Sequence, residues 1–180
     1  MHIRKANNND INQILTVYAK ARQYMKETGN GMQWGDSYPS KQLIEEDIAN
    51  EHCYVGLYDG LICCVFALIP GEDPTYVHIE GAWVNDEEYS SVHRIASDGS
   101  RKGVFEKCIA YCKNVNKNIK IDTHENNLTM QHLLEKNGFS KICRLTYERG
   151  GVALMPAPPA PPFFKKSAMS YNSLKELHKL

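Results

Sequence analysis

The 180-residue sequence lacks an excess of charge of either sign, since 21 Lys and Arg residues stand against 21 Asp and Glu residues. Nucleic acids and anionic membranes attract proteins with a basic surplus, so this balance argues against both as partners. No stretch approaches the roughly 20 consecutive apolar residues that span a bilayer. Residues 1–7 also lack the apolar run of a secretory signal peptide. We therefore expect a cytoplasmic protein.

Cysteine motifs for disulfides or metals are missing as well. None of the cysteines forms a CxxC pair, and disulfides are rare in the cytoplasm. Free cysteine is among the most buried residue types. We expect reduced thiols in the core and no metal site, a chance metal or redox role being the alternative. The cysteines are Cys53, Cys63, Cys64, Cys108, Cys112 and Cys143.

What is present, 42% hydrophobic and 23% charged residues, is the composition of a globular protein. The length is close to the ~100–200 residues typical of one domain. The composition changes abruptly at residues 156–162, which read Pro-Ala-Pro-Pro-Ala-Pro-Pro and predict an extended, polyproline-like spacer. We therefore predict a domain over residues 1–155 and an appendage over residues 156–180. The helix that residues 170–180 could form is too short to be stable alone.

Hydrophobic periodicity and turn residues predict that strands and helices alternate up to residue 155, which indicates an α/β (α+β) domain. An Asp-Gly turn at residues 59–60 predicts a β-hairpin. Helices are predicted at residues 10–28, from 39–40 onwards, at 103–117 and at 127–137. Strands are predicted at residues 2–6, 53–58, 61–69, 76–84, 89–96, 119–122, 139–147 and 152–155.

The most informative unit covers residues 89–104, where a strand is followed by a loop of small and basic residues and then a helix. Such a loop turns several backbone N–H groups toward one point at a helix N-terminus and binds phosphate, which Arg101 and Lys102 would reinforce. The loop has neither Walker lysine spacing nor a GxGxxG motif, which disfavours a nucleotide triphosphatase or a Rossmann enzyme. The alternative is an ordinary connecting loop with surface charges.

A second unit, residues 122–139, reads as a strand, an Asn-capped helix, a Gly C-cap and an aromatic strand start. In order and separation, the two units match the acetyl-CoA motifs of the GCN5-related N-acetyltransferase (GNAT) family, which residues 1–155 resemble. The second family motif is fairly specific, whereas the first is degenerate. The residues that fit the second motif are Asn127, Met130, Leu133, Glu135, Lys136, Gly138 and Phe139.

The resemblance implies a central mixed, mostly antiparallel sheet with a V-shaped splay, flanked by about four helices. It also implies transfer of an acetyl group from acetyl-CoA to a primary amine by direct attack. The acceptor would be an unidentified small molecule or peptide, and a homodimer is left open. The residues expected to contact acetyl-CoA are Ile95, Ala96, Ser97, Ser100, Arg101, Lys102, Gly103, Val104, Asn127 and Met130.

Three residues depart from the family pattern. Ser100 stands where the family has Gln or Arg, and Phe105 stands where a small residue lets the helix approach the phosphates. Phe105 would weaken cofactor binding or shift the start of the helix. Leu134 replaces a frequent general-acid tyrosine. These departures leave open an alternative function, that of a non-catalytic acyl-CoA-binding or regulatory module. A further alternative is that the tail is the functional element, as a proline-rich ligand for a partner.

The candidate general base is His93, because the imidazole of histidine titrates near neutrality. Strand alternation predicts Tyr89 and His93 on one face and Arg94 on the other, and the resemblance implies an oxyanion-binding N–H near Ile95. Glu80 is the second candidate, as relay or amine anchor. The alternative for each of these side chains is an ordinary hydrogen-bonded polar group.

Residues 31–39 form the loop where this fold usually binds the acceptor, and they include three large side chains. Met32, Trp34 and Tyr38 are costly to leave in water, so they either line a pocket or cap the core. Trp34 and Tyr38 are the predicted substrate-binding residues. His124 is expected to be a hydrogen bonder at the end of a strand.

Overall fold

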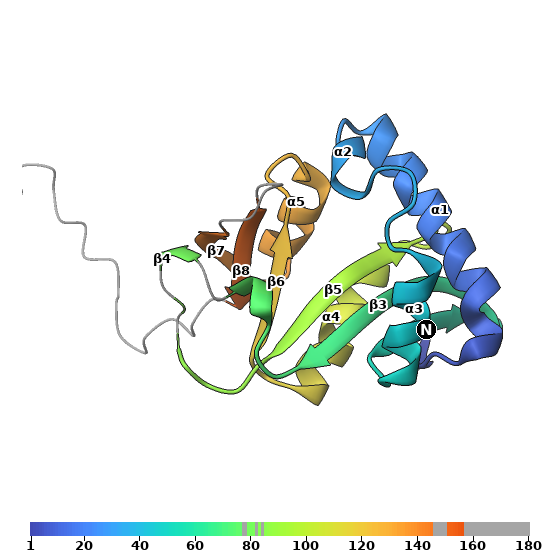
Figure 1. Ribbon diagram of the computed structural model, residues 1–180, viewed down its shortest axis with the longest axis horizontal. Coiled ribbons are helices and arrows are strands. Elements are labelled where there is room, and N and C mark those ends of the chain that lie inside the picture. Colours follow the sequence, from blue (N-terminus) through green and yellow to red (C-terminus); the bar gives the residue numbers. More distant parts are fainter. Residues whose placement is uncertain (77–78, 82, 84, 146–150, 157–180) are drawn as a thin grey trace, which may run out of the picture.

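One twisted sheet of eight strands runs through the described part of the chain (Figure 1). The computed structural model describes residues 1–76, 79–81, 83, 85–145 and 151–156, so the predicted appendage lies outside it except for Pro156, the last residue of a strand. The strand order is β1-β2-β3-β5-β6-β8-β7-β4, and neighbours are antiparallel except β5 and β6. The strands are β1 (His2–Lys5), β2 (Cys53–Tyr58), β3 (Leu61–Pro70), β4 (Ile79–Gly81), β5 (Ser90–Ser97), β6 (Ile119–Thr123), β7 (Phe139–Leu145) and β8 (Gly151–Pro156).

Five α-helices lie within the same described residues, one more than the sequence predicts. The additional helix is the short α2, which forms inside the predicted loop. The mixed, mostly antiparallel sheet and its helices confirm the predicted fold class. The helices are α1 (Ile11–Glu27), α2 (Gly31–Trp34), α3 (Lys41–Ala49), α4 (Val104–Val115) and α5 (Leu128–Lys136).

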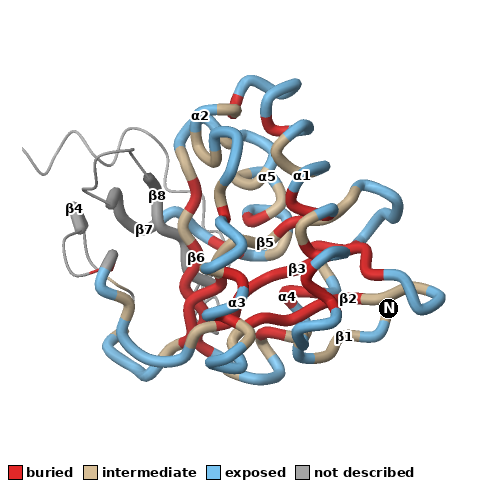
Figure 2. Tube along the Cα trace, turned by 45° about the vertical axis from the view of Figure 1, so that its right-hand side comes forward, coloured by how far each residue is buried: buried red, intermediate tan, exposed pale blue. Residues whose placement is uncertain are grey.

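The two faces of the sheet are buried by different helices (Figure 2). Alternate strand residues face opposite ways, so Val55 and Val65 pack with α1 and α3, whereas Tyr54 and Phe66 pack with α4. The described cysteine side chains are free and buried in these two cores, as predicted. Cys143 has no described side chain.

Strands β5 and β6 begin as parallel neighbours and then separate. Their pairing runs from Ser90 opposite Ile119 to Val92 opposite Ile121. Beyond that point β5 continues along β3 as far as Ser97, while β6 continues along β8 (Figure 1). The predicted V-shaped splay is therefore confirmed.

A β-bulge interrupts β5 just after the point where the strands separate. Val65 of β3 pairs with Ala96, but Ala67 pairs with His93, so two residues of β5 lie opposite one. The extra residue bends the strand, and Arg94 adopts a φ of 53°, in the left-handed region. Simple alternation through this stretch was therefore the wrong expectation, because a bulge resets which residues share a face.

Within the segment predicted as one strand over residues 76–84, the described residues Ile79–Gly81 do not pair with β5. Residues Pro74–Tyr76 form a 3₁₀ turn, and β4 pairs with β7 at the edge of the sheet. Short alternating segments suit any sheet edge, so the partner is decided by tertiary packing. Among the described residues, no helix is both long and apolar enough to cross a membrane.

Candidate functional site

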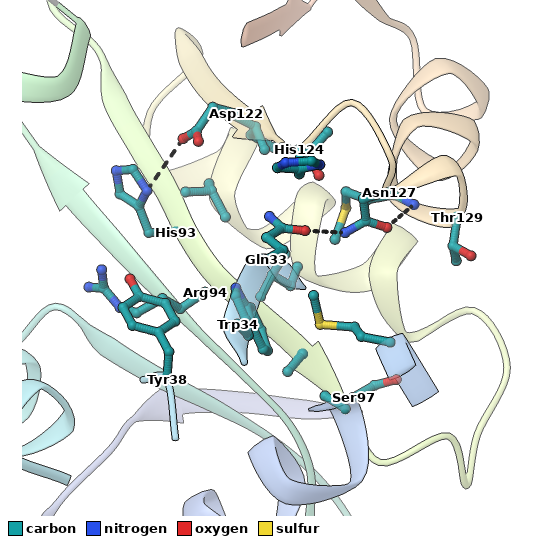
Figure 3. A pocket seen from close by; sticks show the side chains of 18 of the residues that line it. Gln33, Trp34, Tyr38, His93, Arg94, Ser97, Asp122, His124, Asn127 and Thr129 are labelled. Carbon is teal, nitrogen blue, oxygen red and sulfur yellow. Dashed lines mark hydrogen bonds and ion pairs between the residues drawn. The ribbon is translucent and has the colours of Figure 1, made fainter. Parts of the chain in front are cut away.

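A cavity of about 840 Å³ occupies the fork between β5 and β6. Its walls come from the two strands, from α1 and the α2 region, from residues 72–74 and from the first turn of α5 (Figure 3). The parallel strands present their carboxyl ends here, which is where open α/β sheets usually bind ligands.

His93 lies in the cavity wall between two carboxylates. Its Nε2 is 2.5 Å from Oδ2 of Asp73, and its Nδ1 is 3.6 Å from Oδ1 of Asp122 (Figure 3). The three side chains are mostly buried, with 15%, 10% and 19% of the surfaces of His93, Asp73 and Asp122 exposed. The short contact to Asp73 orients the ring so that Nδ1 faces Asp122.

Tyr76 and Tyr89 hold the two carboxylate residues in place. The Tyr76 hydroxyl donates to Oδ1 of Asp122 at 2.9 Å, and the Tyr89 hydroxyl accepts from the backbone N–H of Asp73 at 3.0 Å. Burial, together with the neighbouring Asp122 carboxylate, holds the pKa of Tyr76 well above its usual value. Tyr76 therefore remains a hydrogen-bond donor at neutral pH.

Tyr89, one of the predicted catalytic residues, does not line the cavity. Its ring instead covers the buried ammonium group of Lys120, which lies 3.5 Å from the centroid of Tyr89 and 3.8 Å from that of Trp83. The structure thus brings Tyr89 to the site as a support for Asp73 and not as a group facing the fork.

Glu80, the second predicted base, lies on β4 opposite Arg144. In the order of the sheet, β6, β8 and β7 separate this strand from β5. Its side chain is outside the described residues. The sequence made Glu80 a candidate because its segment directly precedes that of His93, but its described strand pairs with β7 and not with β5.

Only some of the residues predicted to bind acetyl-CoA line the cavity. Ile95, Ala96 and Ser97 line the cavity, followed by Asp98 and Gly99, whereas the other predicted loop residues do not line it. Those residues lead into α4, whose N-cap is Gly103 in the left-handed conformation. They are Ser100, Arg101, Lys102, Gly103 and Val104.

An unpredicted carboxylate lies at the start of this loop. Asp98 accepts hydrogen bonds from the backbone N–H of Ser100 at 3.0 Å and from its hydroxyl at 2.7 Å, and it pairs with Lys20 at 3.4 Å. Although burial opposes ionisation, these hydrogen bonds lower the pKa of Asp98 below its usual value. Arg101 points elsewhere, with Nη2 3.5 Å from Asp59 and its guanidinium over the Tyr58 ring.

Two of the departures from the family pattern are core residues. Phe105 is buried in the hydrophobic cluster beneath α4 and does not line the cavity, and α4 begins at Val104. Leu134 is fully buried in the same cluster. Neither side chain therefore occupies the cavity.

Hydrogen bonds from α1 and α2 to α5 cross one end of the cavity. The Asn127 side chain caps α5 by accepting from the N–H of Met130 at 3.1 Å, and its Nδ2 donates to Oε1 of Gln33 at 3.0 Å (Figure 3). The hydroxyls of Tyr24 and Thr129 are 3.2 Å apart. Asn127 and Met130 line the cavity, as the sequence predicts for donor contacts.

The three large side chains of residues 31–39 have different environments. Trp34 packs edge-on against Tyr18, with centroids 5.7 Å apart, and also lines the cavity, so it combines both roles that the sequence left open. Tyr38 lies beside Trp34 and lines the cavity too. Met32 is 89% exposed, so it neither lines the cavity nor caps the core.

His124 accepts a hydrogen bond on Nδ1 from the N–H of Asn126 at 3.1 Å, which agrees with its predicted role as a local hydrogen bonder. Where the structure describes side chains, no group of three or more His, Cys, Asp and Glu has the arrangement of a metal site. The chemistry that these residues can perform is proton transfer and charge stabilisation.

Solved structures resemble this fold closely. A GNAT-family acetyltransferase from Streptococcus agalactiae 2603 is 31% identical, with a TM-score of 0.80 over 88% of this chain and 96% of that one. The chain belongs to the GNAT family. A putative acetyltransferase from Staphylococcus aureus Mu50 is 27% identical, with a TM-score of 0.66 over 86% of this chain and 97% of that one.

The likeness of fold extends to structures of much lower sequence identity. The NatB acetyltransferase complex, bound to CoA and MES, is 12% identical, with a TM-score of 0.59 over 88% of this chain and all of that one, and shows the fold alone. No protein-family model matches the chain, and no curated protein sequence matches it either. The comparisons support acyl transfer in general.

Sequence reasoning missed Asp73, Tyr76 and Asp122 as partners of His93. Asp73 follows Gly-Glu in a loop without periodicity, so nothing local marks it. Asp122 could have been identified as a partner of His93. Val92 and Ile121 are paired in parallel, and His93 and Asp122 are the next residues on their strands. Parallel pairing of the two strands would have placed them at one edge.

Proposed function

We propose that this GNAT protein is an N-acetyltransferase that moves an acetyl group from acetyl-CoA to a primary amine, with His93 as general base. The observation that carries this proposal is the position of His93 in the fork, oriented by Asp73 and with Nδ1 toward Asp122. A base of this kind is what direct attack by an amine requires, because an ammonium ion must lose a proton before it is nucleophilic.

The residues present fit acetyl-CoA, which supplies an activated thioester and a good leaving thiolate. The strand edge at Ile95, Ala96 and Ser97 would pair with the pantetheine, and the amides at the N-terminus of α4 would hold the pyrophosphate. The cavity volume, about 840 Å³, lies within the roughly 300–1,000 Å³ typical of ligand pockets. The CoA of the NatB complex gives the donor a precedent in this fold.

The proton path begins at the amine. The ammonium ion of the acceptor first loses one proton to Nδ1 of His93, because Nε2 is engaged with Asp73, and His93 passes that proton on to solvent. As the amine nitrogen then bonds to the thioester carbon, its second proton passes to Nδ1 of His93. The Asp73 carboxylate stabilises the imidazolium that forms. Breaking the carbon–sulfur bond then releases the thiolate of CoA, which accepts the proton from His93. Because this thiolate is a good leaving group, no tyrosine acid is needed at the position of Leu134.

The acceptor end supports a small-molecule or peptide amine. Glu72, Asp73 and Asp122 attract an ammonium ion to the fork, and Trp34 and Tyr38 provide flat apolar contacts beside it. The balanced charge of the sequence favours such an acceptor over a nucleic acid or a membrane.

The test uses the full chain with acetyl-CoA and a broad panel of amines. Thiol release in the presence of an amine, with a product heavier by one acetyl group, is expected. Thermal stabilisation by acetyl-CoA without thiol release for any amine would favour the non-catalytic binding module instead. Neither stabilisation nor release would overturn the proposed function.

A further inference from the structure

We infer that Tyr18, Asp47 and the Arg94 side chain form a clamp that holds the β5 bulge and so positions a backbone N–H for the thioester carbonyl. The inference rests on the proposed acetyl transfer. It assigns positioning roles to residues on α1 and α3, two helices that the family motifs do not include.

The backbone conformation of the β5 bulge must be stabilised by neighbouring residues. Arg94 and Ile95 lie opposite the single residue Phe66, and Arg94 is held at a φ of 53° although it has a side chain. Non-glycine residues in this region are strained and persist only where their surroundings enforce the conformation. Arg94 and Ile95 both line the cavity, directly after His93.

Tyr18 holds the bulge by its backbone. Its hydroxyl donates to the Arg94 carbonyl at 3.0 Å, across 76 residues of sequence, and its ring is buried in the core beneath α1. Burial raises the pKa of Tyr18 well above its usual value, so the hydroxyl remains a donor. A hydrogen bond to this carbonyl fixes the peptide plane that joins Arg94 to Ile95, and therefore the direction of the Ile95 N–H.

Asp47 holds the bulge by its side chain. Its carboxylate receives Nη2 of Arg94 at 2.7 Å on one oxygen and Nε at 3.1 Å on the other, a bidentate pair. Both side chains are about nine-tenths buried. A buried pair of this kind is a costly way to gain stability, since desolvation cancels much of the attraction, but it specifies geometry well.

The clamp explains why the chain places an arginine at a strained position. The guanidinium turns away from the reaction and toward α3, so its charge is neutralised by Asp47. In the proposed complex the Ile95 N–H would be the preorganised donor that stabilises the oxyanion that develops when the amine attacks.

The decisive variant is Tyr18→Phe, which removes one hydroxyl and keeps the packing of the ring. We expect kcat to fall about 10- to 100-fold, since loss of a complete oxyanion donor costs about 10²–10³, and the KM for acetyl-CoA to stay unchanged. Tyr54→Phe is the matched control, because Tyr54 is a buried tyrosine outside the cavity. Its kcat should equal that of the wild type.

A spectroscopic readout separates positioning from folding. The infrared carbonyl band of ¹³C-labelled acetyl-CoA should move to lower frequency on binding to the wild-type chain. In Tyr18→Phe and Asp47→Asn this shift on binding should be smaller. Arg94→Lys, which cannot make the bidentate pair, should behave like Asp47→Asn. If Asp47→Asn does not fold, Tyr18→Phe and Arg94→Lys decide the question.

The outcomes distinguish the two proposals. Turnover and a band shift in the wild type that persist unchanged in Tyr18→Phe and Arg94→Lys would overturn the clamp and leave the acetyltransferase intact. Failure of the wild-type chain to bind acetyl-CoA would overturn the proposed function, and the clamp's role with it.

Discussion

The two ends of the cavity are built from different kinds of interaction. At the reaction end, buried carboxylates flank His93, and a buried Arg94–Asp47 pair lies beside it. At the other end α1 and α2 contact α5 by neutral hydrogen bonds, from Asn127 to Gln33 and between Tyr24 and Thr129. The charged contact at that end, Lys20 with Asp98, is longer, at 3.4 Å, and its lysine is exposed. Charged, buried contacts keep a geometry fixed, whereas neutral, exposed ones can open at small cost.

This difference explains how one cavity can have a rigid reaction end and an accessible entrance. Chemistry needs donors and bases that do not reorganise during the reaction. Entry of a long donor such as acetyl-CoA needs walls that separate and close again. The predictions below remove one contact at a time, first at the reaction end and then at the other.

The largest effect is expected for His93→Ala. Without the base, kcat should fall by about 10²- to 10⁴-fold, while calorimetric binding of CoA remains. His124→Ala is the control, because His124 also lines the cavity but bonds only to its own loop in the structure. Thiol release that persists in His93→Ala would show that another group or a water chain takes the proton.

Asp73→Asn should have the next largest effect. The amide keeps the shape but not the charge, and hydrogen bonds to charged groups contribute roughly 1.5–3 kcal/mol, so kcat should fall about 10- to 100-fold. The matched control is Glu72→Gln, since the neighbouring Glu72 is exposed in the same wall. Equal losses in both variants would mean that Asp73 acts by general charge and not by orienting His93.

At the other end, Asp98→Asn should strengthen donor binding. The carboxylate lies at the loop that would hold the pyrophosphate, and Asn keeps the acceptor for the Ser100 N–H. Because the pKa of Asp98 is lowered, its charge is present at neutral pH and lost only in acid. The KM for acetyl-CoA should fall severalfold near pH 7, and the gain should vanish as pH falls through the lowered pKa; a higher KM would contradict this.

Tyr24→Phe is expected to have the smallest effect. It removes the contact between Tyr24 and Thr129, one neutral hydrogen bond on a half-exposed side chain. Thermal unfolding should show a loss of about 1 kcal/mol or less, with kcat unchanged. A large loss of kcat would mean that this end also takes part in the chemistry, and the contrast between the two ends would fail.

Much of the fold was predictable because its signals are local. The helix at residues 10–28, the Asp-Gly hairpin and the Asn-capped helix before Gly138 all rest on capping and periodicity, and all three are present. The family motif at residues 127–139 is local in the same way. The site was less predictable: His93 and residues 95–97 do line the cavity, whereas Glu80 lies on β4, which pairs with β7 and not with β5.

Spacing and capping in the sequence were sufficient for most helices and strands, since they act over a few residues, and the family resemblance implied the splayed sheet. The tertiary structure decided which carboxylates meet His93, that Tyr18 and Asp47 hold Arg94, and that β4 pairs with β7. These contacts join residues 20 to 76 positions apart, and one inserted bulge residue changes which side chains share a face. No local pattern encodes such pairings, because they are selected by the packing of the whole chain.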